Sequence, residues 1–87
     1  MKLKINEVIA DVKDELLCYE EGEAVVDRWE KEFREWIEKN KGKHKDIVAD
    51  KNSVFLKIKD EEEIFDIADS YLDAVAEGNV KKYWETF

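Results

Sequence analysis

The chain has 87 residues, of which 44% are charged and 44% hydrophobic, and its formal net charge is −8. This length suits one compact domain, residues 1–87, with enough apolar material for a core. The acidic excess disfavours direct binding to nucleic acid or to an anionic membrane, because phosphate contacts need clustered Lys and Arg. No apolar run approaches the roughly 18 residues of a membrane span. A single cysteine forms no internal disulfide, and we expect a soluble protein of the cytoplasm.

The N-terminal part of the sequence predicts two amphipathic helices. Residues 2–5 alternate in polarity, which is a weak strand pattern, and Asn6 suits the N-cap of a helix from about 7 to 20. The apolar stripe of this helix consists of Ile5, Val8, Ile9, Val12, Leu16 and Tyr19. The phase of the apolar pattern changes across Gly22, which predicts that the helix breaks there.

The second helix, from Glu23 to about Lys39, has the strongest amphipathic pattern in the chain. Its stripe is formed by Val25, Val26, Trp29, Phe33, Trp36 and Ile37. At about 100° per residue these side chains occupy an arc of roughly 120°. Such an aromatic arc is typical of a core face, and a groove for a partner is the alternative.

A basic connector, residues 40–45, follows the second helix and contains the only histidine, His44. Lysines at positions 39, 41, 43 and 45 are compatible with a phosphate site, but a solvated loop is the simpler interpretation. His44 has no second His and no Cys or acid at ligand spacing, so it predicts no metal site.

Residues 46–58 predict a β-hairpin with Lys51-Asn52 at its turn, since Asn tolerates the positive φ that such turns need. A two-residue loop pairs Ala49 with Val54 and Ile47 with Leu56. The resulting apolar face contains Ile47, Ala49, Val54, Leu56 and Ile58. Because a two-stranded ribbon is only marginally stable, this face must rest on the helices.

The stretch from Asp60 to Gly78 predicts an acidic amphipathic helix. Asp60 and Glu63 have the spacing of a capping box, and Gly78 suits the C-terminal cap. The apolar side contains Ile64, Phe65, Ala68, Tyr71, Leu72 and Val75. Asn79 then opens a short last helix, whose aromatic residues Tyr83, Trp84 and Phe87 are expected to cover the core or, alternatively, to form a dimer contact.

The same stretch contains carboxylates and no basic residue: Asp60, Glu61, Glu62, Glu63, Asp66, Asp69, Asp73 and Glu77. The acids at 62, 66, 69, 73 and 77 fall on one helix face, in a row about 22 Å long. Carboxylates spaced i,i+4 repel each other by a few tenths of a kcal/mol per pair. The row is either a solvated face or a surface for a positively charged partner, which would relieve that repulsion.

The sequence offers little for catalysis. Cys18 and His44 lie on different predicted elements, and the hydroxyl residues besides tyrosine are only Ser53, Ser70 and Thr86. No phosphate loop, zinc signature or calcium loop is present. We therefore expect a protein that is not an enzyme, with no catalytic residue, no metal site and no cofactor.

Two short segments resemble small acidic anti-CRISPR proteins encoded by phages. Residues 5–13, INEVIADVK, are similar to the opening helix of such an inhibitor, and residues 60–65, DEEEIF, to its acidic C-terminal run. The resemblance covers less than a fifth of the chain. It implies an inhibitor whose carboxylates occupy the site of a CRISPR effector that normally reads the PAM.

Together these patterns predict a mainly helical α+β fold: two helices, a hairpin, the acidic helix and a short helix. The predicted function is a non-enzymatic protein that inhibits or regulates a basic, nucleic-acid-handling partner through the eight carboxylates. The alternatives are an assembly protein that forms a homodimer through aromatic surfaces, and an antitoxin or immunity protein. Electrostatic docking weakens steeply with salt, whereas hydrophobic association does not.

Overall fold

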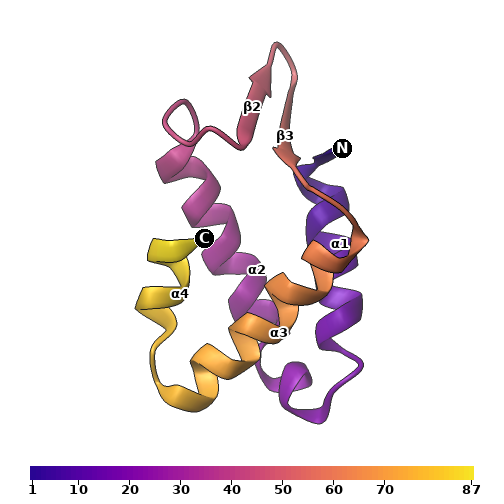
Figure 1. The fold of residues 1–87 in the computed structure, drawn as a ribbon, viewed down its shortest axis with the longest axis vertical. Helices are drawn as coiled ribbons and strands as arrows, with labels where there is room; N and C mark the ends of the chain where they lie inside the picture. The colour runs from indigo at the N-terminus through magenta and orange to yellow at the C-terminus, as the bar shows by residue number, and fades with distance from the viewer.

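A three-stranded antiparallel sheet lies at one end of the molecule, and four helices form the remainder (Figure 1). The computed structural model describes residues 1–87. The strands are β1 (Lys2–Lys4), β2 (Ile47–Asp50) and β3 (Ser53–Lys57). The helices are α1 (Ile5–Leu16), α2 (Glu20–Asn40), α3 (Glu61–Glu77) and α4 (Val80–Thr86). The predicted mainly helical α+β fold is thus confirmed.

The predicted hairpin has the expected register. Ile47 lies opposite Leu56 and Ala49 opposite Val54. Residues 2–4 form a real strand, β1, on the other side of β3, so that the sheet has the order β1-β3-β2. The backbone N–H of Ile58 extends this pairing by donating to the carbonyl of Met1 at 2.7 Å.

One residue of the hairpin's predicted inner face is misplaced. Ile47, Leu56 and Ile58 are buried, as expected, but Ala49 is exposed. It lies near the turn of the hairpin, and the end of this ribbon projects away from the helices (Figure 1). Alternation of side chains fixes which residues share a face, but burial also needs a helix beneath that face.

α1 begins and ends earlier than the sequence pattern predicts. It starts at Ile5 directly after β1, and Lys4 occupies the N-cap position without a capping side chain. Asn6 is therefore not the cap; its side-chain oxygen accepts a hydrogen bond from Arg34 Nη2 at 3.3 Å. The helix ends at Leu16, and residues 17–19 form the turn into α2.

The sequence pattern predicts a helix break at Gly22, and this is wrong. Gly22 lies inside the first turn of α2. It is buried, and a Cβ placed on it would stand 1.7 Å from the carbonyl oxygen of Leu16. The residue is needed because the start of α2 passes against the end of α1. The phase change that suggested a break comes from the turn at residues 17–19.

The core is built around aromatic rings on α2, α3 and α4. Trp29, Phe33 and Trp36 follow one another along α2 in stacked orientations. Tyr71 of α3 and the α4 aromatics complete the aromatic cluster, defined as Trp29, Phe33, Trp36, Tyr71, Tyr83, Trp84 and Phe87. The indole Nε1 of Trp29 donates to the Tyr83 hydroxyl at 3.2 Å, and this hydroxyl donates to the carbonyl of Ile67 at 3.0 Å. The C-terminal aromatics therefore cover the core.

The buried face of α3 is rotated relative to the prediction. Ile64, Ala68 and Tyr71 are buried as expected, and Leu72 and Val75 are half-buried. Phe65, however, is 46% exposed, and Ile67 and Ala74 are buried instead. The sequence pattern places the large Phe65 ring on the apolar side, but α4 packs against α3, where the Tyr83 hydroxyl donates to the carbonyl of Ile67.

Candidate partner-binding face on α3

α3 has a well-defined start and end. The Asp60 carboxylate accepts a hydrogen bond from the backbone N–H of Glu63 at 3.2 Å. The Glu63 carboxylate accepts one from the N–H of Lys59, one residue before the N-cap position. Gly78 ends the helix in the left-handed conformation, with φ of 70°. Asp60 and Glu63 thus stabilise the helix, and the acids of the first turn favour its positive dipole end.

We expect Asp60→Ala to lower the free energy of unfolding by about 1 kcal/mol, because the N–H of Glu63 loses its acceptor. Glu61→Ala is the matched control, since it removes an acid from the same turn without removing a cap. Urea denaturation measures both. Equal losses in the two variants would show that charge, and not the capping hydrogen bond, carries the effect.

The predicted row of acids faces solvent. Each of its members, Glu62, Asp66, Asp69, Asp73 and Glu77, is exposed. All ion pairs of the structure involve other residues: Lys13–Glu30, Arg28–Glu32, Arg34–Glu30 and Lys41–Glu38. The row, together with exposed Glu61, is therefore a line of carboxylates that form no intramolecular ion pair. We call the five residues the acidic row.

One member of the acidic row has an aromatic neighbour from outside α3. Tyr19, in the turn before α2, lies close to the carboxylate of Asp69. This negative charge, together with partial burial and the charge of Glu15, raises the pKa of the Tyr19 hydroxyl. Tyr19 and Phe65 are 41% and 46% exposed, respectively. Phe65 precedes Asp69 by four residues, so the two side chains are neighbours on the α3 surface.

Sequence reasoning missed both aromatic residues as part of this surface. It placed Tyr19 in the stripe of the first helix and Phe65 in the core. The only available signal was that Phe65 lies at the edge of the apolar arc, beside the acids. The position of Tyr19 follows from the end of α1 at Leu16, which the sequence pattern did not define.

The other side of the acidic row borders a groove between α3 and α4. One part, of about 210 Å³, is lined by Asp66, Ser70 and Phe87, among others. The adjoining part, of about 320 Å³, is lined by Asp73, Glu77 and Lys82, among others. Lys82 is the one cationic side chain along this groove. The acids thus lie on an open surface and do not converge on a closed cavity.

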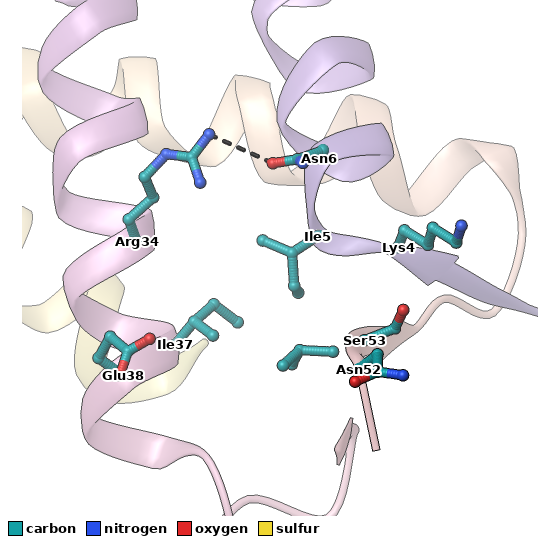
Figure 2. A pocket seen from close by; sticks show the side chains of 9 residues that line it. Lys4, Ile5, Asn6, Arg34, Ile37, Glu38, Asn52 and Ser53 are labelled. Carbon is teal, nitrogen blue, oxygen red and sulfur yellow. Dashed lines mark hydrogen bonds between the residues drawn. The ribbon is translucent and has the colours of Figure 1, made fainter. Parts of the chain in front are cut away.

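A separate cleft of about 490 Å³ lies between the start of α1, the second half of α2 and the hairpin (Figure 2). None of the predicted partner-binding residues lines it. Arg34 lines this cleft, and its guanidinium group already forms two hydrogen bonds: it donates to Glu30 at 3.1 Å and to Asn6 at 3.3 Å. Figure 2 shows Arg34 pointing to Asn6 across the upper part of this cleft. The arrangement fits a structural link between α1 and α2.

The remaining reactive groups are dispersed. Cys18 is exposed, and its thiol donates to the carbonyl of Asp14 at 3.4 Å. His44 packs edge-on against Trp36, and its Nδ1 accepts from the backbone N–H of Asp46 at 3.1 Å. No three His, Cys, Asp or Glu side chains are grouped so that they could hold a metal ion.

Comparison of the chain with protein-family models, curated proteins and solved structures gave no match. The resemblance of residues 5–13 and 60–65 to anti-CRISPR proteins therefore stays a prediction. None of the helices combines the length and apolar character that are needed to cross a membrane.

Proposed function

We propose that the protein is a non-enzymatic binding protein that inhibits or regulates a basic, nucleic-acid-handling partner in the cytoplasm through the acidic row. The observation that carries this proposal is that all five carboxylates are exposed on one capped helix and that none forms an intramolecular ion pair. A basic partner would supply the missing positive charge. The spacing of the row resembles the regular negative charge of a nucleic-acid backbone.

Electrostatics favour such a partner over other classes. A net charge of −8 attracts a cationic protein at long range and repels nucleic acid and anionic membranes. The mutual repulsion along the acidic row falls when Lys or Arg side chains are placed between the carboxylates. Binding would then be fast and strongly dependent on ionic strength.

The resemblance to anti-CRISPR proteins makes a CRISPR effector the first partner to test. In such a complex, the acids near the start of α3 would compete with the DNA segment that the effector reads. An antitoxin or immunity protein would use the same surface against a basic toxin. A homodimer formed through α4 is less favoured, because Tyr83 is buried and Trp84 and Phe87 pack against α2.

The triple variant Asp66→Lys, Asp69→Lys and Asp73→Lys tests the proposal. We expect it to lower the affinity for the partner by more than about tenfold and to reduce the salt dependence of binding, because attraction becomes repulsion at the contact. The partner is first captured from a cell lysate with the tagged wild-type protein at low and high salt and identified by mass spectrometry. Its affinity for each purified variant is then measured by calorimetry.

The matched control is Asp11→Lys, Asp14→Lys and Glu35→Lys. It changes the net charge by the same amount at exposed positions on α1 and α2. We expect this variant to keep most of the affinity, since only the long-range attraction changes. Equal affinities and salt dependences for the wild type and the α3 variant would contradict the proposal.

A further inference from the structure

Two exposed aromatic rings beside the acidic row lie outside the aromatic cluster. Of the ten aromatic residues, only Tyr19, Phe55 and Phe65 lie outside the aromatic cluster. Phe55 is half-buried in the sheet, and the ammonium of Lys2 lies 5.6 Å from its ring centroid. Tyr19 and Phe65 have no such cover and are 41% and 46% exposed.

These two rings adjoin one carboxylate of the acidic row. Phe65 lies one helical turn before Asp69, and the hydroxyl of Tyr19 lies near the Asp69 carboxylate, which raises the pKa of Tyr19. Glu15 of α1 contributes to the same shift from the other helix. We call Tyr19, Phe65 and Asp69 the anchor patch. It combines two aromatic rings with the negative charge of an α3 carboxylate.

We propose that Tyr19 and Phe65 are apolar anchors of the binding face, and that the partner presents a cationic amphipathic segment to them. This inference rests on the proposed function and specifies its partner surface. Aromatic side chains dominate the binding energy of many interfaces, because they bury a large area at little cost in conformational entropy. Apolar groups of the partner segment would cover the two rings, while its Lys or Arg residues pair with Asp69 and its neighbours in the acidic row.

Charge complementarity selects this occupant over others. A second copy of the chain would bring another net charge of −8 to an already acidic face, and the two copies would repel each other. A purely polar polycation would neutralise the carboxylates but leave both rings exposed to water. A segment with both basic and apolar side chains can pair with the carboxylate of the anchor patch and also cover its two rings.

The test uses two synthetic peptides of equal length and equal positive charge as probes. In one peptide, Lys residues alternate with Leu and Trp; in the other, they alternate with Ser and Gly. Calorimetry gives their affinities for the full chain, and amide shift mapping by NMR locates the site. We expect the amphipathic peptide to bind at least about tenfold more tightly than the polar one, with shifts around Phe65 and Asp69.

Phe65→Ala should remove most of this tenfold difference, and Phe55→Ala, the control for loss of an aromatic residue elsewhere, should preserve it. The Lys variant of Asp66, Asp69 and Asp73 should weaken both peptides. Equal binding of the two peptides, unchanged by Phe65→Ala, would overturn the anchor patch while leaving the acidic row intact. Binding of both peptides that is insensitive to the α3 charge reversal would instead overturn the proposed function. Circular dichroism verifies that each variant is folded.

Discussion

Gly22→Ala is expected to lower the free energy of unfolding by about 3 kcal/mol. The added Cβ would lie 1.7 Å from the oxygen and 2.5 Å from the carbon of the Leu16 carbonyl group, so the backbones of α1 and α2 must move apart. An exposed helical glycine would behave oppositely, because Ala is favoured in a helix by about 1 kcal/mol. Small domains have little stability to lose. The measurement is urea denaturation followed by circular dichroism.

Gly42→Ala is the matched comparison for this prediction. Gly42 has φ of 86°, but no atom lies near its missing Cβ. The same chemical change there introduces only backbone strain, and we expect a loss of about 1 kcal/mol. A Gly22→Ala variant that is as stable as the wild type, or more stable, would contradict the close contact between α1 and α2.

Gly22 also illustrates what the sequence could and could not predict. The apolar stripes of both N-terminal helices were evident, since helical spacing alone sorts their side chains. The end of α1 was not evident, because no residue between 17 and 19 is a strong helix terminator. The sequence pattern therefore places the helix break at Gly22. Its actual role is a close approach between two helices, which is a tertiary contact and leaves no mark in local periodicity.

The hairpin was predicted to the correct register because its turn and its hydrophobic alternation agree. The third strand is a different case. Residues 2–4 have a weak pattern by themselves, and β1 becomes a strand because β3 offers an open edge to pair with. A short strand of this kind depends on where another part of the chain lies. It is therefore beyond what a local pattern can establish.

For the candidate site, the acidic row was predictable and the anchor patch was not. Polar residues at helical spacing on a capped helix must face solvent once the opposite face is buried. Whether Phe65 is buried depends on which neighbour covers that edge of α3. Sequence spacing places Phe65 on the apolar side and leaves Ile67 outside it, but α4 packs against Ile67, and Phe65 is exposed.

A second large effect is expected at Glu32, a carboxylate that links three elements of the fold. It accepts hydrogen bonds from the Tyr71 hydroxyl of α3 at 2.8 Å and from the Trp84 indole of α4 at 2.9 Å. On its own helix, Arg28 donates to the other carboxylate oxygen at 3.0 Å. The sequence pattern does not distinguish Glu32 from the other charged residues of α2.

Glu32→Ala should therefore cost about 2 kcal/mol of unfolding free energy, because two partly buried donors lose their acceptor. Glu35→Ala, at an exposed position on the same helix, is the control and should change stability by less than about 0.5 kcal/mol. The double variant Glu32→Ala with Trp84→Phe tests the link to α4. If the loss of stability in the double variant equals the sum of the losses in Glu32→Ala and Trp84→Phe alone, Glu32 and Trp84 do not interact as the geometry indicates.

The same carboxylate predicts a pH dependence. Burial alone would raise the pKa of Glu32, but hydrogen bonds from Trp84, Arg28 and Tyr71 outweigh it and hold the pKa below the ordinary value of 4.5. A carboxyl group with a depressed folded-state pKa contributes its full stability above the unfolded-state value, and this contribution is lost as the pH falls through the folded-state pKa. Glu32→Gln should thus be less stable than the wild type near neutral pH, by about 1 kcal/mol. As the pH falls through the depressed folded-state pKa of Glu32, the two proteins should converge, because the wild-type carboxylate then becomes neutral as well. A stability difference that stays constant from neutral to acidic pH would show that Glu32 acts through its shape and not through its charge.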